Sequence, residues 1–343
     1  MQIEHLELAA IDASGAMASS TGLGILVRVR AQSGLTGLGE APTDETSVLG
    51  SQTTVSDWLN RYGAEVVGAE CGNINRLNQL LDGVDAGGKS GCPAARAAVE
   101  MAVYDLIGKA RDCPLHVVLG GGYRDTLERV GQIGSDDEDV GGSASAMIEA
   151  GFAAIRLKIK DGSAQTVKRI QSVLDAVGHR PLVDIVAEQS LGNEARASML
   201  VENLLTRQFW PNLGLVQPLH QLDLEGHRRL REKLPIPIVL EESITSPAAM
   251  SQVVRTGVAD RIVLDIWRVG GLLNARRIAN MCESAAIGVM VSGTCRSAVG
   301  RAAMGHLAVT VHGSCPVHFG SDQTEAMDPL GQGSGLGVDL KWD

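Results

Sequence analysis

The sequence predicts an α/β fold, a (β/α) barrel preceded by an N-terminal α+β capping domain. Three observations lead to this prediction. From about residue 130 short apolar strands alternate with amphipathic helices, the pattern of repeated βα units in a parallel sheet. Seven or eight such units within about 190 residues favour a sheet closed into a barrel over an open sheet. Before that point the pattern is different, because an antiparallel hairpin is followed by helices.

The capping domain is predicted to begin with a small antiparallel meander. Residues 1–10 and 24–31 have strand character, and the glycine-rich segment 34–39 favours a hairpin into a further strand. The clearest helix spans 92–112, where Pro93 stands in the first turn and apolar residues recur at helical spacing.

The barrel is predicted from seven apolar strands with amphipathic helices between them. The C-terminal residues are expected to form a last short strand that returns to the capping domain. We therefore divide the chain into a capping domain (1–122), a barrel (123–325) and a C-terminal return (326–343). The expected strands span 129–134, 154–160, 181–186, 213–219, 237–243, 261–267 and 289–294.

The segment FAAIRLKIK (152–160) combines an apolar strand with three cations. On a strand, Arg156, Lys158 and Lys160 share one face, and the apolar residues between them share the other. Burying cations on such a strand costs free energy unless they are paired or bind a ligand. Two interpretations stay open at this point. The segment is an edge strand with a solvated basic face, or a barrel strand whose lysine faces a ligand or acts as a base.

Composition narrows the class of partner. The 343-residue chain has a formal net charge of −10, which argues against nucleic acid and anionic membranes as partners. No apolar run reaches the roughly 18 residues of a membrane helix, and the N-terminus has no signal-peptide pattern. The six cysteines are scattered without a C-x-x-C pair, as expected of reduced thiols. We therefore expect a cytoplasmic protein.

Polar side chains gather at the predicted carboxyl ends of the barrel strands. Such ends converge on one site in a (β/α) barrel. A single polar strand end more often faces only a loop, and the succession of them is what favours a site. Lysines opposite carboxylates there indicate a general base beside a divalent cation with oxygen ligands. The residues are Lys158, Lys160, Asp184, Gln217, Glu241, Glu242, Asp265, Ser292 and Thr294.

Segments over nearly the whole chain match one known pattern. These are GLTGLGEA (34–41), the helix 95–121, the βα units 218–243 and 259–289, and GLGVDL (335–340). With them the sequence resembles the mandelate racemase and muconate lactonizing branch of the enolase superfamily. The resemblance implies a modified TIM barrel of (β/α)7β-like topology. It also implies an isomerase or lyase in which Mg2+ on three carboxylates binds a carboxylate substrate and stabilises the enediolate left when a base removes the α-proton.

The resemblance also implies catalytic residues. The family's Lys-x-Lys lines up with Arg156-x-Lys158, which makes Lys158 the base with the cation of Arg156 beside it. Lys160 falls where the family usually has glycine. Asp265 takes the place of a lysine in muconate-type members, and two roles stay open for it, a second catalytic group or an ion-pair partner of Lys158. The histidine that an aspartate supports in the racemase branch aligns with Thr294, so no His–Asp dyad is expected.

The implied magnesium ligands match only in part. Asp184 takes the first position, and Glu241 or Glu242 takes the third, depending on which spacing the chain follows. Val216 stands at the second position and cannot bind a metal. The side chain of Gln217 points to the opposite face of the strand, so it could be a ligand only if the strand register shifted by one residue. Because affinity for a hard cation follows ligand charge, the loss of one carboxylate weakens the expected Mg2+ site.

Two functions stay open from the sequence. The first is Mg-assisted abstraction of the α-proton of a small carboxylate by a racemase or epimerase, cycloisomerase or dehydratase, and the missing second base favours one-base chemistry. The alternative is a divergent homologue with a lost or altered metal site that acts as a binding protein or runs other chemistry. The candidate substrate contacts are the polar loops 12–22 and 43–53 with Lys160, Gln217 and Thr294. A homo-oligomer is expected because the branch is commonly oligomeric.

Overall fold

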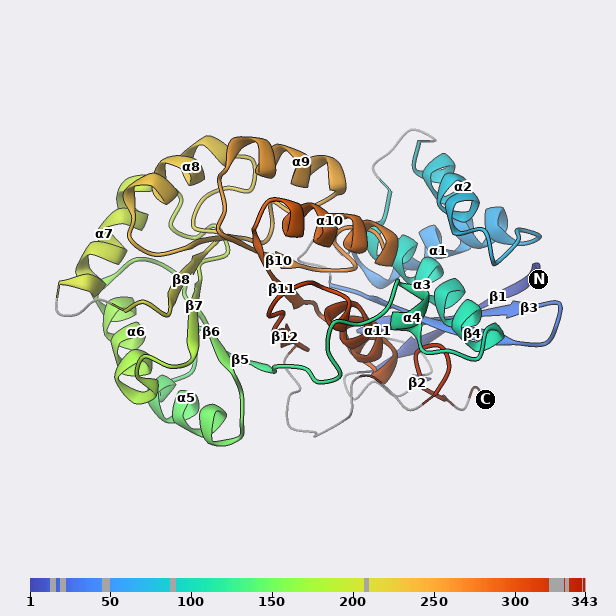
Figure 1. Ribbon diagram of the computed structural model, residues 1–343, viewed down its shortest axis with the longest axis horizontal. Helices are drawn as coiled ribbons and strands as arrows, with labels where there is room; N and C mark the ends of the chain where they lie inside the picture. The colour runs from blue at the N-terminus through green and yellow to red at the C-terminus, as the bar shows by residue number, and fades with distance from the viewer. Residues whose placement is uncertain are drawn as a thin grey trace.

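The chain forms two joined parts, a capping domain around a four-stranded antiparallel sheet and an eight-stranded parallel barrel. In Figure 1 the barrel occupies the left and centre, and the capping sheet lies at the right together with both chain termini. The computed structural model describes residues 1–12, 17–18, 23–44, 50–86, 91–206, 210–320, 330, 333–340 and 342. The loops predicted at 12–22 and 43–53 lie partly outside the described residues.

The capping domain has the predicted meander and helices. Its sheet has the order β2-β1-β3-β4, with β1 paired antiparallel to both β2 and β3. The strands are β1 (Ile3–Ile11), β2 (Met17–Ala18), β3 (Gly24–Ala31) and β4 (Thr36–Pro42). The helices are α1 (Gln52–Val66), α2 (Ile74–Ala86), α3 (Pro93–Ala110) and α4 (Leu115–Val118).

Helix α3 is buried on every side and packs directly on strand β4. A helix without a polar face belongs in the interior, and residues 94–108 of α3 are all buried. The close approach depends on two strand glycines. A Cβ at Gly37 would overlap the carbonyl oxygen of Ala102, and a Cβ at Gly39 would overlap that of Ala98.

We expect Gly39→Ala to lower the free energy of unfolding by about 1–3 kcal/mol, because the added methyl group must push the α3 backbone away from β4. Urea unfolding of the purified variant measures the change. Gly83→Ala in α2 is the control, since a Cβ there meets nothing within 4 Å. Equal stability of Gly39→Ala and the wild type would contradict this account of the packing.

The barrel has eight strands in the order β12-β11-β10-β9-β8-β7-β6-β5. An isolated parallel bridge between Arg129 and Val317 joins the two ends of this sheet and closes the barrel. Seven of these strands are predicted from the sequence, whereas β12, which is only two residues long, is not. The strands are β5 (Val130–Ile133), β6 (Ala154–Lys158), β7 (Leu182–Val186), β8 (Leu213–Val216), β9 (Ile238–Leu240), β10 (Arg261–Leu264), β11 (Gly288–Ser292) and β12 (Val317–His318).

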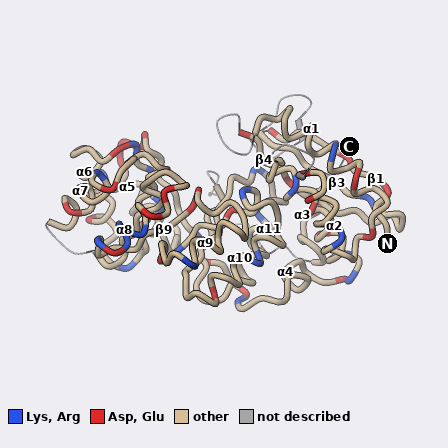
Figure 2. The backbone as a smooth tube through the Cα atoms, turned by 90° about the horizontal axis from the view of Figure 1, so that it is seen from above, with Lys and Arg blue, Asp and Glu red and all other residues tan. Residues whose placement is uncertain are grey.

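In the described part of the chain, seven helices surround the barrel strands. Charged residues of both signs are interspersed along those at the far end of the molecule from the capping sheet (Figure 2). No helix among the described residues has the length and apolar character needed to cross a bilayer. The helices are α5 (Val140–Glu149), α6 (Ala164–Val177), α7 (Glu194–Leu205), α8 (Leu224–Lys233), α9 (Pro247–Thr256), α10 (Leu272–Ser284) and α11 (Ala298–Val309).

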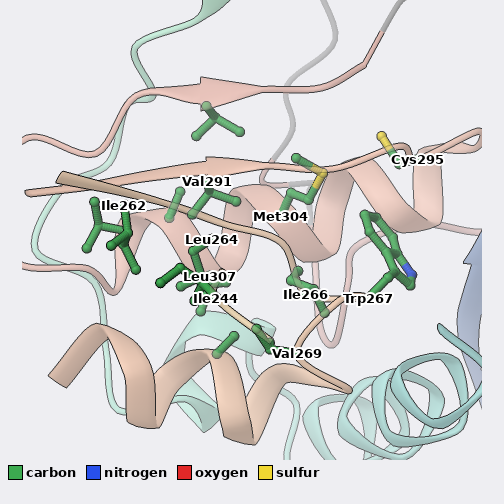
Figure 3. Packing of buried hydrophobic residues seen from close by; sticks show 14 of the residues in the cluster. Ile244, Ile262, Leu264, Ile266, Trp267, Val269, Val291, Cys295, Met304 and Leu307 are labelled. Atoms are coloured by element: carbon green, nitrogen blue, oxygen red, sulfur yellow. The ribbon is translucent and has the colours of Figure 1, made fainter. Parts of the chain in front are cut away.

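Contacts around Trp267 and Glu40 join the capping sheet to the mouth of the barrel. Figure 3 shows Trp267 beyond the end of β10, near Ile266 and Cys295. Its indole Nε1 donates a hydrogen bond of 2.6 Å to the main-chain oxygen of Glu40 on β4. The buried Glu40 carboxylate accepts bonds of 3.0 Å from the backbone N–H groups of Ser297 and Gly300 at the start of α11. Because β4 is bound to the loops after β10 and β11, the capping sheet lies against the carboxyl ends of the barrel strands.

The C-terminal residues return to the capping domain, but the predicted last strand does not form among the described residues 333–340 and 342, where Gly335 makes only an isolated bridge with Pro114. Gly335 donates to the oxygen of Cys113 at 2.9 Å, and Leu336 donates to the carboxylate of Asp105 on α3 at 2.7 Å. Near the end of the chain, the guanidinium of Arg28 lies 4.6 Å from the ring centre of Trp342.

Candidate active site

Polar side chains lie at the carboxyl ends of the barrel strands, above an apolar layer inside the barrel. That layer is a small cluster formed by Val130, Ala154, Val186, Val216, Val239, Val263 and Met290. In the strand register Lys158 is paired with Val186, and Val186 with Val216. Val216 therefore belongs to the apolar filling of the barrel.

Lys158 stands at the end of β6 and is paired with a glutamate from the loop after β7. Its Nζ lies 2.6 Å from Oε1 of Glu188, and both side chains are partly exposed. Glu188 and Gln189 have positive φ angles of 45° and 68°, in the left-handed region that non-glycine residues rarely adopt. Strained backbone of this kind clusters at functional sites, and here it turns Glu188 toward Lys158.

Arg156 and Glu241 form a buried ion pair across the mouth. Nη2 of Arg156 donates to Oε2 of Glu241 at 2.5 Å, and Arg156 is only 2% exposed. A second guanidinium, that of Arg268, lies 3.9 Å from the other oxygen of Glu241. Burial raises the pKa of Glu241, but the positive charges of Arg156 and Arg268 outweigh it, so the pKa lies below its ordinary value.

Asp184 forms a second buried ion pair inside the barrel. Its two oxygens accept bonds of 2.6 and 3.2 Å from the guanidinium of Arg261, at the start of β10. Two strand glycines make room for this pair. A Cβ at Gly214 would overlap both partners, and a Cβ at Gly288 would lie 2.8 Å from Cγ of Arg261. Both oxygens of Asp184 are thus held by Arg261.

These pairings involve side chains that were predicted as magnesium ligands. Of the predicted positions, Asp184 is held by Arg261, Val216 carries no ligand atom, and Glu241 is held by Arg156. Glu242, the alternative third ligand, has a buried oxygen without a hydrogen-bond partner among the described residues. Among the described residues no group of three or more histidine, cysteine, aspartate or glutamate side chains is arranged to hold a metal ion. Mg2+ requires near-ideal octahedral oxygen ligation, and this set of residues does not fit it.

Glu242 and Asp265 flank the pair of Arg156 and Glu241. Burial and the neighbouring charge of Glu241 raise the pKa of Glu242 to about 7. Oδ1 of Asp265 accepts hydrogen bonds from the backbone N–H groups of Trp267 and Arg268, at 2.8 and 3.2 Å. Burial raises the pKa of Asp265 despite the positive charge of Arg268. Lys158 is thus paired with Glu188 and not with Asp265.

The Gln217 side chain forms hydrogen bonds with the loop after β9. Its oxygen accepts from the backbone N–H groups of Glu241 and Ser243 at 2.9 and 3.2 Å, and its nitrogen lies 2.9 Å from the Ser243 hydroxyl. The residue is fully buried. Gln217 therefore fixes the position of the Glu241 backbone.

The other two predicted substrate contacts lie at or near the surface. Lys160 is exposed and forms an ion pair with Asp136, from the loop after β5. Thr294 is half-buried in the loop that follows β11.

His318 at the end of β12 is a polar residue of the mouth that is not among the predicted site residues. It is 5% exposed, and its Nδ1 lies 2.9 Å from the hydroxyl of Ser292 on β11. Burial and the positive charge of Arg156 lower its pKa to about 3. Because β12 is only two residues long, strand periodicity does not find it. The only local indication of this strand is that a polar residue follows the apolar Val317.

We expect His318 to make the fold acid-sensitive. Its pKa of about 3 lies below the ordinary 6.5, so the stability from its neutral form is complete above pH 6.5 and is lost as the pH falls toward 3. At about 1.4 kcal/mol per pH unit, acidification from pH 7 to 4 removes about 3 kcal/mol. Urea unfolding at both pH values should show a smaller loss for His318→Gln. His5→Gln, at an exposed histidine of β1, is the control and should behave as the wild type. Equal losses in all three proteins would contradict the prediction.

Comparison with protein families matches both parts of the chain. Residues 13–120 match the N-terminal domain of mandelate racemase and muconate lactonizing enzymes, and residues 139–343 match the enolase C-terminal domain-like family. Together the two matches span nearly the whole sequence.

Curated relatives are similar over most of their length. The chain is 30% identical to a chloromuconate cycloisomerase of Pseudomonas sp. (strain P51), over 93% of this chain and 89% of that protein. It is also 30% identical to an N-succinylamino acid racemase of Thermus thermophilus, over 90% of this chain and 85% of that protein. An L-Ala-D/L-Glu epimerase of Bacillus subtilis is 28% identical over 83% of this chain and 77% of its own.

Solved structures share the fold. A dipeptide epimerase from Enterococcus faecalis V583, complexed with Mg and the dipeptide L-Leu-L-Tyr, superposes with a TM-score of 0.85 at 23% identity. That match covers 99% of this chain and all of the other. The N-succinyl Arg/Lys racemase from Bacillus cereus gives a TM-score of 0.84 at 24% identity, over 99% of this chain and 96% of the other. At these identities the likeness shows the fold alone.

Proposed function

The chain belongs to the mandelate racemase and muconate lactonizing enzyme family of the enolase superfamily, and on this premise we propose that it is an isomerase that transfers a proton at the carbon next to a carboxylate. The single observation that supports this proposal most is the position of Lys158. It lies at the end of β6, in a barrel mouth that also holds two guanidinium groups. The named relatives are racemases, epimerases and cycloisomerases, which supports the same class of reaction.

In the proposed reaction, Nζ of Lys158 as the free amine takes the α-proton of the substrate. The electron pair of the broken C–H bond moves into the carboxylate, which becomes an enediolate. The enediolate then breaks the bond between the β-carbon and a ring oxygen, so that the ring opens to an isomeric unsaturated acid and the proton stays on Lys158 until it passes to solvent. In the reverse direction the β-carbon–oxygen bond forms, the ring closes, and Lys158 delivers the proton to the α-carbon. Glu188, 2.6 Å from Nζ, orients the lysine side chain at the mouth.

The position opposite the base favours one-base chemistry. Directly after β10 the mouth carries Asp265, whose Oδ1 accepts two backbone hydrogen bonds. No second lysine lies at this position of the mouth among the described residues. A single lysine delivers and removes the proton on one face of the substrate. We therefore propose a cycloisomerase-like or other same-face proton transfer over a racemisation.

Solvent exchange tests the proposal directly. The protein is incubated in D2O with N-succinyl amino acids, with dipeptides such as L-Ala-L-Glu, and with chloromuconate, the substrate classes that the relatives' names suggest. Proton NMR then measures deuterium at the α-carbon and any isomeric product. We expect exchange or isomerisation with at least one class, and exchange without inversion would support a single base.

A second candidate is a binding protein without catalysis. The observation that favours it is the ion pair of Lys158 with Glu188, which occupies the proposed base. A carboxylate that binds tightly but shows no exchange in D2O and no product would favour this candidate over the isomerase.

A further inference from the structure

We propose that this barrel has exchanged the divalent cation of its family for fixed guanidinium groups, and that it binds the anionic end of its substrate on Arg156 and Arg268. The inference rests on the proposed function for the kind of ligand, an organic carboxylate.

The first step is the charge balance at the former ligand positions. Asp184 and Glu241 each carry one negative charge, and Val216 carries none. Each carboxylate has its own buried guanidinium, Arg261 for Asp184 and Arg156 for Glu241. A dication placed between these carboxylates would displace two guanidiniums or be repelled by them.

The second step is that the Arg261 pair is built into the backbone of the barrel. Strand β8 carries Gly214 beside Asp184, and strand β11 carries Gly288 beside Arg261. A side chain at either position would overlap the pair. Glycine in a strand interior weakens the strand and marks a close approach of other groups. Two glycines that flank one ion pair show that the space is shaped for the arginine.

The third step is a cluster of polar atoms that lack partners. Among the described residues, seven buried side-chain nitrogen or oxygen atoms have no hydrogen-bond partner, and four of them belong to this mouth. Buried polar groups are nearly always paired, so a cluster of exceptions needs a ligand or another cause. The four atoms are Nε of Arg156, Oε2 of Glu242, Nη1 of Arg268 and Nε2 of His318.

The two guanidinium nitrogens among these four atoms favour an anion as the ligand. Nε of Arg156 and Nη1 of Arg268 are obligatory donors, and guanidinium groups match the planar carboxylate. Oε2 of Glu241 accepts a hydrogen bond of 2.5 Å from Nη2 of Arg156. Oε1 of Glu241 lies 3.9 Å from Nη1 of Arg268, which is too far for a hydrogen bond. A carboxylate held by both arginines would keep positive charge next to the oxygens on which the enediolate charge develops.

The metal half of the proposal is tested with Mn2+. Full-length protein is stripped with EDTA, dialysed and mixed with Mn2+, and the EPR signal of the free ion is measured. We expect no loss of signal in the wild type or in Asp184→Asn. One Mn2+ bound per chain in the wild type and lost in Asp184→Asn would overturn the inference.

The anion half is tested with oxalate, a planar dianion, by calorimetry in EDTA-containing buffer. We expect one site per chain. Binding should weaken about tenfold or more in Arg268→Gln, because a charged hydrogen bond is lost, and less in Arg268→Lys, which keeps the charge. The matched control is Arg277→Gln, the same change at an exposed position of α10. Absent oxalate binding, or equal binding in Arg268→Gln and Arg277→Gln, would overturn the inference.

These outcomes are separable from failure of the proposed function. Oxalate binding that depends on Arg268, without Mn2+ binding and without any exchange in D2O, would uphold the anion site and refute the isomerase. Exchange that is abolished by EDTA and restored by Mg2+ would uphold the isomerase and refute the metal-free site.

Discussion

Lys158→Ala should lower the rate of α-proton exchange by about a hundredfold to ten-thousandfold, the contribution of a positioned general base. The variant removes the amine at the end of β6 and leaves the guanidiniums of Arg156 and Arg268 in place. Substrate binding should therefore change far less than turnover. Single-turnover exchange in D2O and calorimetric binding of the same substrate measure the two effects separately.

Lys160→Ala is the matched control for this experiment. Lys160 lies two residues further along the same segment, is exposed, and forms its ion pair with Asp136. Removal of this lysine should leave exchange within about twofold of the wild type, because surface ion pairs contribute little. Equal exchange rates in Lys158→Ala and the wild type would remove Lys158 from the base position, and a large loss in Lys160→Ala would move the base there.

Arg261→Met should lower the free energy of unfolding by about 3–5 kcal/mol, because it leaves the carboxylate of Asp184 buried without its partner. The Asp184 side chain is 1% exposed and that of Arg261 20%, so water offers little compensation. The double variant Asp184→Leu and Arg261→Met removes both charges. It should recover most of the loss, since a buried ion pair can be replaced by apolar groups at little cost. Chemical denaturation of the three proteins measures these values.

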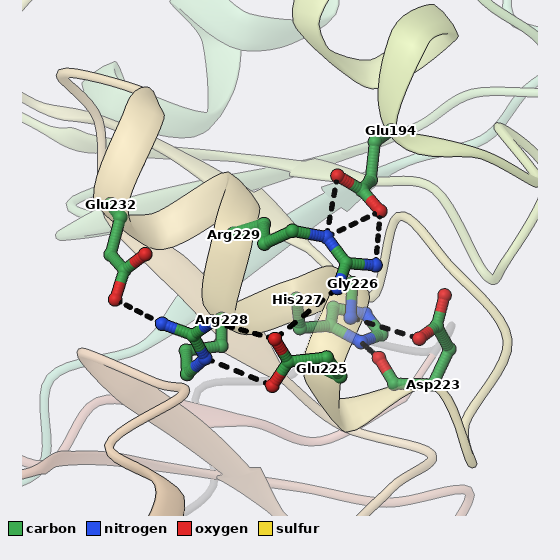
Figure 4. A network of polar contacts seen from close by, with 8 residues as sticks. All are labelled: Glu194, Asp223, Glu225, Gly226, His227, Arg228, Arg229 and Glu232. Atoms are coloured by element: carbon green, nitrogen blue, oxygen red, sulfur yellow. Dashed lines mark hydrogen bonds and ion pairs between the residues drawn. The ribbon is translucent and has the colours of Figure 1, made fainter.

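An exposed ion pair on the barrel helices serves as the control. Figure 4 shows Arg229 of α8 beside Glu194 at the start of α7, with Nη2 of the arginine 2.6 Å from Oε1 of the glutamate. Arg229→Met should cost less than about 1 kcal/mol, because solvent screens this pair. If Arg261→Met cost no more than Arg229→Met, Asp184 would have to be neutral or solvated, and the charge balance proposed for the barrel interior would fail.

The barrel and its capping domain could be predicted from the sequence because both depend on local patterns. Strand and helix periodicity predict the βα repeats, and the glycines of GLTGLGEA (34–41) predict the hairpin between β3 and β4. The two-residue strand β12 is too short for its alternation to be recognised, so His318 was not predicted at the barrel mouth. Because all strands of a parallel barrel run in the same direction, residues near their carboxyl ends lie at one mouth of the barrel. The sequence therefore predicts that Lys158, Asp184 and Glu241 lie at this mouth or just below it.

Which charge pairs with which was decided by the tertiary structure. Asp184 is 77 residues from Arg261 in the sequence, and Arg156 is 85 residues from Glu241. The alternation of side chains along each strand predicts only that these side chains point into the barrel. The partner of each depends on strand stagger and on the space left at Gly214 and Gly288. Residue type and alternation therefore determined the fold and a lysine at its mouth. Packing across the closed barrel decided that the carboxylates expected to hold a metal are held by arginines, because a buried charge must be neutralised by whichever group reaches it.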